Sequence, residues 1–376
     1  MRMTPHTLDA AAAAAAQKGT PEPLVGRLRA IAAQALPRMY RRATHRYVFT
    51  VRREEGLTPA GASDRYSAIT LIGLAADGFE RWKLAYEPAP LASALVDDVH
   101  ESGNLGDAAL IAWAAHATGV DPSPAWSHLK RLLERRTTHP TVEVAWALAA
   151  ATIDHTRAGG QLQSELAKHL LTAWHAESGL FGHTAGGHNP RAHIACFADQ
   201  VYPIFALARY AAHQRDLPAL DAAARCARRI CALQGAEGQW YWHYDPRTGD
   251  LVEGYPVYAI HQDAMGPMAL RALQEAGGGA FDQYIARGMR WLERAPELHG
   301  RSLIDDQAAM VWRKVARREP RKMTRYVQAA CTRVHPKLRA PAVDRLFPPV
   351  SIDFEDRPYH WGWFLYAWAP VQDRRD

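Results

Sequence analysis

The sequence is poor in the features that mark secreted and membrane-spanning proteins. Its 376 residues include only four cysteines, and none of them forms a C-x-x-C pair. This predicts reduced thiols rather than a disulfide framework or a zinc site. Because no stretch holds 18 consecutive apolar residues, we expect no membrane-spanning helix. The alanine-rich start, Met1 to Gly19, lacks the leucine-type apolar segment of a signal peptide, so we expect a cytoplasmic protein.

Sustained strand patterns are also scarce. Short β-like pieces at Tyr47–Arg52 and Gln239–Tyr244 are the exceptions, and alanine is abundant elsewhere. The apolar fraction of 48% is ample for a sizeable core. The composition therefore predicts an all-α fold.

Charge is present in excess and is unevenly distributed. The net charge of +6 and the pI of about 9.2 reflect basic stretches at Arg38–Arg53 and Arg313–Arg345. Such an excess suits an acidic polysaccharide, nucleic acid or a membrane surface, and equally an arginine-rich face in water. No nucleic-acid recognition motif accompanies it, which argues against nucleic acid.

A repeat of helical pairs is visible along the chain. Glycines recur about every 60 residues, and glutamines follow an acid or a histidine at helix starts. The glycines are Gly179, Gly238 and Gly300, and the glutamines are Gln200, Gln262 and Gln307. One helix of each pair has a charged face, whereas its partner is apolar nearly all round.

Stacked in a ring, such pairs form an α/α toroid with an inner and an outer layer. Helix starts near residues 66, 107, 142, 200, 262, 307 and 359 predict an (α/α)6 or (α/α)7 toroid with short β-hairpin loops on the active-site rim. We expect an N-terminal arm and first helix over 1–45 and the toroid over 46–376, with a basic insertion at about 313–347. The starts of the inner helices would share one rim, which suits an anionic or oxygen-rich ligand.

Candidate chemistry is densest between Gly238 and Leu273. Tyr258 and His261 are three residues apart at a helix start and would share a face, with Gln262 and Asp263 beside them. A histidine moves protons near neutral pH, and a tyrosine can act as its partner acid. A buried histidine satisfied by capping groups would give the same pattern.

The preceding aromatic segment, W-Y-W-H-Y-D, provides a second candidate set. His243 and Asp245 are two residues apart, so on a strand they point the same way. Trp240 and Trp242 have the opposite parity, and at least one of these rings can stack on a sugar. A hairpin whose rings pack on the toroid is the alternative.

Further polar residues open the other inner helices. They are Asp64, Arg65, Asp107, Glu143, Asp199, Gln200, Asp306 and His360. Each acid alone is an ordinary helix cap. Their recurrence on one rim is what favours a binding site.

Two metal-like patterns are weak. His183, His188 and His193 are five residues apart, but no cysteine or glutamate stands at a ligand-like spacing, so we predict no metal site. Asp97-Asp98-Val99-His100-Glu101 resembles the magnesium-diphosphate motif of class I terpene synthases, without the second motif of that family. Helix caps or surface acids explain it equally well.

The stretch His261-Gln262-Asp263-Ala264-Met265, followed by Ala269-Leu270, is similar to the x-Q-[AS]-E…A-L pattern of N-acylglucosamine 2-epimerase relatives. Glucuronyl C5-epimerases and α/α-toroid polysaccharide lyases share that architecture. The resemblance implies catalytic histidines, and only His261 and His243 are placed where this carries over.

These observations predict a carbohydrate-active enzyme: a lyase, epimerase or hydrolase of oligo- or polysaccharides that needs no cofactor. His261 would be the base or acid and Tyr258 its partner, with Trp240 or Trp242 as a stacking platform. Arg65 and Arg191 would neutralise a uronic carboxylate. The alternatives are a terpenoid cyclase or prenyl-diphosphate-binding toroid, and a non-catalytic binder of an anionic glycan.

Overall fold

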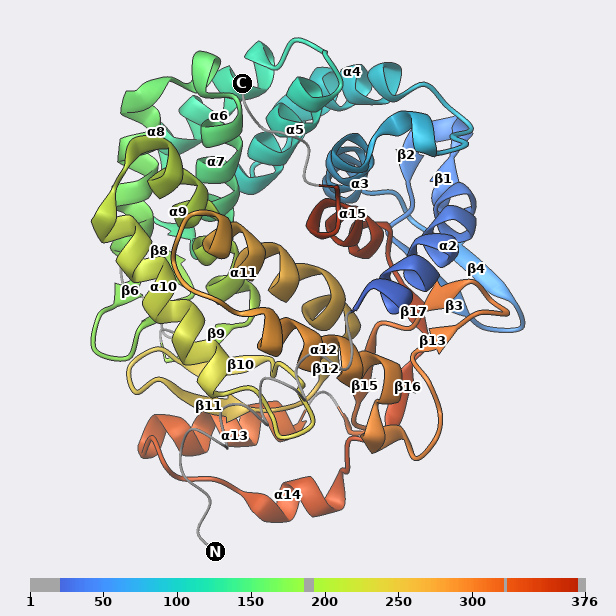
Figure 1. The fold of residues 1–376 in the computed structure, drawn as a ribbon, viewed down its shortest axis with the longest axis vertical. Coiled ribbons are helices and arrows are strands. Elements are labelled where there is room, and N and C mark those ends of the chain that lie inside the picture. The colour runs from blue at the N-terminus through green and yellow to red at the C-terminus, as the bar shows by residue number, and fades with distance from the viewer. Residues whose placement is uncertain (1–20, 186–192, 321–322, 371–376) are drawn as a thin grey trace, which may run out of the picture.

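The computed structural model describes residues 21–185, 193–320 and 323–370. Within these ranges two concentric layers of helices form a ring (Figure 1). No helix in the described ranges is both long and apolar enough to cross a membrane.

The inner layer is built from the most apolar helices. In chain order these are α3 (Asp64–Asp77), α5 (Leu105–Ala117), α7 (Thr141–Ile153), α9 (Ala198–Gln214), α11 (Gly266–Glu275) and α15 (Pro358–Ala367). A single π-helical turn, η4 (His261–Met265), precedes α11. Each inner helix contacts the next, and α15 returns to α3, so the ring is closed.

The outer layer consists of amphipathic helices, each with one buried face and one solvent-exposed face. They are α2 (Glu22–Met39), α4 (Pro88–Asp98), α6 (Ser123–Arg135), α8 (His155–Leu171), α10 (Leu217–Ala232) and α12 (Asp282–Arg294). On α10, for example, five of the six alanines and Cys226 are buried, whereas Arg228 is exposed. This alternation of inner and outer helices is the predicted all-α toroid.

The described residues hold six inner helices, so the (α/α)6 alternative is confirmed and the seven-pair alternative is wrong. The helix expected at Asp305-Asp306-Gln307 is instead a hairpin of β13 (Ile304–Asp305) and β14 (Met310–Val311). Asp305 Oδ1 accepts the Ala308 N–H inside that turn. Ala309 has a φ of 52°, a left-handed conformation that stops a helix from continuing.

Short antiparallel sheets join the helices. Three have three strands: β9 (Ala195–Cys196) with β10 (His243–Asp245) and β11 (Asp250–Glu253); β12 (Val257–Tyr258) with β15 (Lys314–Ala316) and β16 (Ser351–Asp353); and β3 (Thr50–Arg53) with β4 (Leu57–Ala60) and β17 (Glu355–Asp356). The two-stranded pairs are β1 (Tyr40–Arg41) with β2 (Arg46–Tyr47), β5 (His139–Pro140) with β8 (Thr184–Ala185), and β6 (Trp174–His175) with β7 (Leu180–Phe181). Several of these hairpins lie where inner helices begin, as predicted for the rim.

Residues 313–347, which we call the flap, do not follow the alternation of inner and outer helices. After β15 they form α13 (Met323–Val334) and α14 (Pro341–Leu346), at the lower edge of Figure 1. Helix α13 packs on β11, and the Arg339 side chain donates to the Leu251 carbonyl. The flap is therefore folded onto the β9–β10–β11 sheet.

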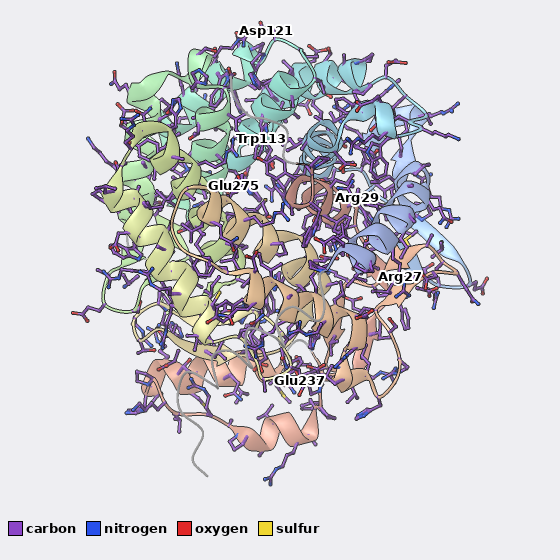
Figure 2. The ribbon with its side chains drawn as sticks, in the orientation of Figure 1. Arg27, Arg29, Trp113, Asp121, Glu237 and Glu275 are labelled. Atoms are coloured by element: carbon purple, nitrogen blue, oxygen red, sulfur yellow. The ribbon has the colours of Figure 1, made fainter. Side chains whose placement is uncertain are left out.

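Aromatic rings fill the middle of the inner layer. Trp113 of α5, labelled in Figure 2, lies 5.8 Å from Trp363 and 6.1 Å from Phe205, measured between ring centroids. Trp146 and Tyr202 continue this packing at 5.1 Å. At the periphery Arg27, also labelled, pairs with Asp306 at 2.5 Å and ties α2 to the β13–β14 turn.

Two glycines close the ring. A Cβ on Gly73 of α3 would stand 2.0 Å from the Gly362 carbonyl oxygen of α15, and one on Gly362 would stand 2.5 Å from the Ile69 oxygen. Real Cβ atoms do not approach backbone this closely, so the two helices touch backbone to backbone. Only residues without a side chain permit this crossing.

We predict that Gly73→Ala and Gly362→Ala each lower the free energy of unfolding by about 3 kcal/mol, because the first and last inner helices must separate. Gly26→Ala is the matched control: Gly26 is an exposed position inside α2 with nothing within 4 Å of the added methyl group. It should raise stability by up to about 1 kcal/mol. Urea unfolding measures all three, and an unchanged midpoint for Gly73→Ala would contradict the close contact.

Candidate functional site

The starts of the inner helices come together on one side of the ring, which we call the rim. Cys196 and Phe197 lead into α9, and Phe197 lies 4.5 Å from the His261 ring at the start of η4. His360 of α15 in turn contacts Asp263. The rim therefore unites residues from helices far apart in the sequence.

Gln200 and Gln262 act as matching clamps on the backbone. The Gln200 amide accepts from Phe181 N–H at 2.8 Å and donates to the Phe181 carbonyl at 2.9 Å. Gln262 makes the same pair of bonds with Trp240, at 3.0 and 3.2 Å. Both side chains are fully buried, so each fixes the hairpin before its helix.

Asp263 and His360 form a buried ion pair between η4 and α15. His360 Nε2 donates to Asp263, with 2.9 Å to each carboxylate oxygen, and His360 Nδ1 lies 3.9 Å from Asp356. Burial opposes charge on the ring, but Asp263 and then Asp356 outweigh it and raise the pKa of His360. Burial also raises the pKa of Asp356 to about 6. The pair joins neighbouring inner helices below the rim.

His261 lies beneath the rim with 5% of its surface exposed. Its ring packs between Phe197 and Tyr258, 5.0 Å from the latter, and it bonds to the Trp240 backbone. The buried Nδ1 atom has no hydrogen-bond partner in the described structure. Burial lowers the pKa of His261 to about 3, so the imidazole is neutral at neutral pH.

Tyr258 and Trp242 lie above His261, at the junction with the flap. Their ring centroids are 5.3 Å apart. Arg313 and Lys314 each lie 5.3 Å from the Tyr258 ring centroid, and Arg325 lies 4.0 Å from that of Trp242. Burial raises the pKa of Tyr258, while Arg313 and Arg325 oppose that rise. The flap thus brings cations to two of the predicted site residues.

The other aromatic-segment residues lie deeper. Trp240 is fully buried against Gly266 and Gly288, so only Trp242 of the two tryptophans has surface for a ligand. His243 is 3% exposed and stacks on Trp242 with centroids 4.1 Å apart. Asp245 accepts from the Arg247 backbone and guanidinium at 3.0 and 2.7 Å and organises the β10–β11 turn.

Asp199 is buried and holds two groups of the rim. It accepts from Cys196 N–H at 2.7 Å and from His183 Nδ1 at 3.1 Å. The His183 side chain keeps 41% of its surface exposed. Arg191 and His188 lie outside the described residues. The third histidine of that set, His193, instead has its Nε2 atom 3.2 Å from the Ala329 carbonyl oxygen, within hydrogen-bond distance.

Two of the acids that the sequence placed at inner-helix starts, each alone an ordinary cap, form a carboxylate pair at the rim. Asp107 accepts from Arg65 Nε at 2.5 Å and from Ser102 Oγ at 3.0 Å. Glu143 Oε1 accepts from Asn104 Nδ2 at 2.7 Å, and Asn104 Oδ1 caps α5 by accepting from Asp107 N–H at 3.1 Å. One asparagine therefore links two acids that open neighbouring inner helices.

The environments of these two acids differ. Burial raises the pKa of Glu143, although Asn104 and Arg65 oppose this and the Asp107 charge adds to it. Asp107 is instead tied to a guanidinium, which also lies 5.4 Å from the Trp146 ring centroid. The pKa of Glu143 is thus pushed upward by burial, whereas Asp107 has a guanidinium partner, and such contrasting surroundings are what a pair of acid–base groups needs.

Sequence reasoning missed an arginine–tyrosine group beside them. Arg357 Nη1 donates to the Tyr66 hydroxyl at 2.7 Å, and Tyr66 stacks on Tyr359 at 4.6 Å. Arg357 and Arg313 both pair with Glu355. The R-P-Y-H sequence at 357–360 was visible, but no spacing rule links it to residue 66.

The acidic dipeptides serve as ion-pair partners in the fold. Asp98 pairs with Arg46 at 2.6 Å, and Arg46 also binds Asp64. Asp305 pairs with Arg53. Within the described ranges, no group of three or more histidine, cysteine, aspartate or glutamate side chains is placed to hold a metal ion.

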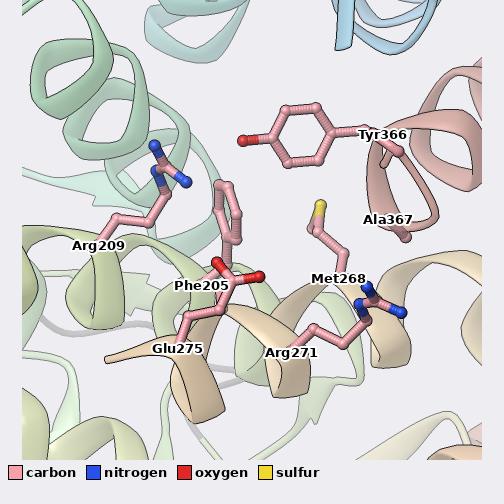
Figure 3. Close-up of a pocket in the computed structure, with 9 residues that line it drawn as sticks. Phe205, Arg209, Met268, Arg271, Glu275, Tyr366 and Ala367 are labelled. Atoms are coloured by element: carbon pink, nitrogen blue, oxygen red, sulfur yellow. The ribbon is translucent and has the colours of Figure 1, made fainter. Parts of the chain in front are cut away.

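A small hollow lies at the opposite mouth of the ring. Phe205, Arg209, Met268, Arg271 and Tyr366 line a cavity of about 20 Å³ there, with Glu275 at its edge (Figure 3). That volume holds about one water molecule. Because the rings described above fill the ring's middle, a substrate would reach the carboxylate pair from the rim side.

We predict that the free energy of unfolding rises with pH between about 3 and 6.5, in part through His261. Its pKa is lowered on folding, so the unfolded chain binds the extra proton in this window and acid favours unfolding. His261→Phe should flatten this rise whatever its effect at pH 7. Exposed His335→Phe in the flap is the control, and equal pH slopes for both variants would contradict the buried neutral ring.

No known family model matches the chain, and no curated protein matches it in sequence. Solved structures do match. The unsaturated glucuronyl hydrolase from Bacillus sp. GL1, described as responsible for glycosaminoglycan degradation, aligns with a TM-score of 0.57 and 13% identity over 93% of this chain and 96% of that one.

Two further structures agree. An unsaturated glucuronyl hydrolase specific for heparin gives a TM-score of 0.55 at 12% identity, covering 92% of this chain and 94% of that one. The Streptococcus agalactiae enzyme in complex with dGlcA-GalNAc6S gives 0.55 at 9%, covering 92% and 90%. At these identities the likeness concerns the fold: this chain has the helical ring found in unsaturated glucuronyl hydrolases.

Proposed function

We propose that this chain is a carbohydrate-active enzyme that hydrolyses an acidic oligo- or polysaccharide at the rim. The observation that carries the proposal is the pair Asp107 and Glu143, two carboxyl groups in contrasting environments on neighbouring inner helices, bridged by Asn104. Hydrolysis of a glycosidic bond needs one group that donates a proton and one that accepts it.

In this proposal Glu143 is the acid. Burial moves the pKa of Glu143 upward, the direction that a proton donor to the leaving-group oxygen needs. Asp107, paired with Arg65, takes the proton of the attacking water. The water oxygen forms the new bond to carbon as the bond to the leaving oxygen breaks, so the step needs no cofactor.

An acidic substrate follows from the other rim residues. Arg65, Arg313 and Arg357 reach the rim from three different segments and are each partly exposed, as are the stacked rings of Tyr66 and Tyr359. Guanidinium groups pair with planar carboxylates, and rings stack on sugars. The fold is that of enzymes named for unsaturated glucuronyl substrates, which supports the same substrate class here.

A lyase or epimerase reaction is the second candidate, because Tyr258 lies beside His261 and under Arg313 and Lys314. Burial raises the pKa of the Tyr258 phenol, but the neighbouring cations oppose that rise and so lower the cost of ionising a phenol that takes a proton from a sugar carbon. His261 would then position Tyr258, in keeping with the resemblance to N-acylglucosamine 2-epimerase relatives. Trp242 serves as the stacking platform in either case.

We predict that Glu143→Gln and Asp107→Asn each lower kcat by about a hundredfold or more on a responsive acidic oligosaccharide, with smaller effects on KM. The substrate comes from a panel of acidic and neutral oligosaccharides, with prenyl diphosphates as the non-saccharide arm. Glu134→Gln, an exposed site on outer helix α6, is the control.

The same panel separates the two candidates. If the Tyr258→Phe variant still releases new reducing ends from the substrate, the result supports hydrolysis. Full activity in Glu143→Gln together with loss in Tyr258→Phe would move the reaction to the second candidate. Turnover of prenyl diphosphates alone would refute both.

We further predict that Asn104→Ser moves the alkaline limb of the kcat/KM profile to higher pH. Burial raises the pKa of Glu143 and the Asn104 bond lowers it, so losing that bond raises the pKa and keeps the acid protonated longer. Serine retains a helix-capping oxygen, so α5 should keep its start. A limb that stays in place would remove Glu143 as the acid.

A further inference from the structure

The flap concentrates positive charge to an unusual degree. Residues 313–347 contain eleven lysines and arginines against two acids, a net charge of +9. The rest of the chain has 34 basic and 37 acidic residues, a net charge of −3. The basic character of the protein is thus a property of this one segment.

A hollow lies between the flap and the β12–β15–β16 sheet. Its volume is about 340 Å³, and four basic side chains line it together with Glu319 and Asp353. They are Lys314, Arg317, Arg318 and Arg325. Arg317 is committed to Glu253 at 3.1 Å and Lys314 to Asp353 at 2.9 Å, whereas Arg318 is exposed.

The charge balance in this hollow favours an anion. Burial and then the neighbouring Arg313 lower the pKa of Lys314, while Asp353 opposes them, so a second cation acts on this lysine. An anionic ligand would relieve that repulsion. The space is sufficient for a sugar unit with a carboxylate or a sulfate group.

Two residues that line the hollow also contact aromatic rings at the rim. Lys314 lines the hollow and lies over the Tyr258 ring, and Arg325 lines it and lies over Trp242. A chain with one unit at the rim would pass these rings before its next charged unit reached the hollow.

Large exposed apolar side chains also gather on the flap. Among the described residues they are Met323, Tyr326, Val334, Leu338 and Leu346, with Tyr326 at 64% exposure. Basic and apolar residues together also suit an anionic membrane. A flat bilayer cannot enter a hollow, however, whereas a chain with projecting anionic groups can.

We propose that the flap is a docking surface for an acidic polysaccharide, with a carboxylate or sulfate of a non-reacting unit bound in the hollow between the flap and the β12–β15–β16 sheet. Identifying the polymer as substrate rests on the proposed function. The flap then makes the enzyme selective for charged chains over single units.

The test compares the variant Arg318→Gln/Lys337→Gln/Arg345→Gln with a control, Arg135→Gln/Arg228→Gln/Arg290→Gln. All six side chains are exposed, and the control positions lie on outer helices α6, α10 and α12. Both triples remove three charges. Affinity for a heparin dodecasaccharide is measured from about 50 to 200 mM salt.

We expect the flap triple to weaken heparin binding roughly tenfold and to reduce the salt slope by two to three, because fewer counterions are released. The control should change affinity less than about twofold. Hyaluronan, which has carboxylates only, and dextran sulfate identify the preferred anion, and neutral dextran should not bind. The single variant Arg318→Glu tests the hollow itself. It should weaken heparin binding at least as much as the loss of one positive charge from the flap does.

Equal losses in both triples, or binding unchanged by the flap triple and by Arg318→Glu, would overturn the inference. So would flap-dependent binding to phosphatidylserine vesicles without binding to any acidic chain. Turnover of a disaccharide should be the same in all variants. Flap-dependent heparin binding by a protein that turns over no saccharide would support this inference and contradict the proposed function.

Discussion

The backbone contact between α3 and α15 is the constraint on which the rest of the structure depends. A ring of inner helices works only if its first and last members meet, and here they meet through Gly73 and Gly362, where any side chain would collide. Closure completes the ring of six inner helices, whose starting ends come together at the rim. Because those ends expose unpaired N–H groups and positive dipole ends, closure also creates the rim that favours anionic groups.

Burial divides the polar residues of the rim into two sets. The deeper set, which includes Gln200, Gln262 and the Asp263–His360 pair, is fully occupied with partners inside the protein. It costs free energy to bury such groups unless they are paired, so they define geometry rather than bind ligand. The upper set, with Asp107 and Glu143, remains half-buried and can meet a substrate. The same residue types serve both purposes, and depth decides between them.

The sequence supported the fold better than the site. Six of the seven predicted helix starts match, because polar first-turn residues such as Asp107 and Asp199 come before strongly apolar stretches. The predicted start at Gln307 failed because a left-handed turn at Ala309 made a hairpin of a similar pattern.

Roles within the site depended on depth and on distant contacts, which no local pattern shows. Trp240 and Trp242 are two residues apart, yet one is enclosed by Gly266 and Gly288 and the other faces Arg325. Arg357 and Tyr66 form a hydrogen bond although they are 291 positions apart in the sequence. No sequence pattern singled out Asn104, and only the folded ring places its amide against Glu143.

The contact between α3 and α15 also affects how the chain folds during translation. Gly362 lies 289 positions after Gly73, so at ordinary translation rates α3 waits roughly 15 to 60 s on the ribosome before its neighbour exists. During that time the flank of α3 that α15 will cover is open to water and to other nascent chains. A message cut short before codon 358 would yield a polypeptide with five of the six inner helices and no way to shield that flank.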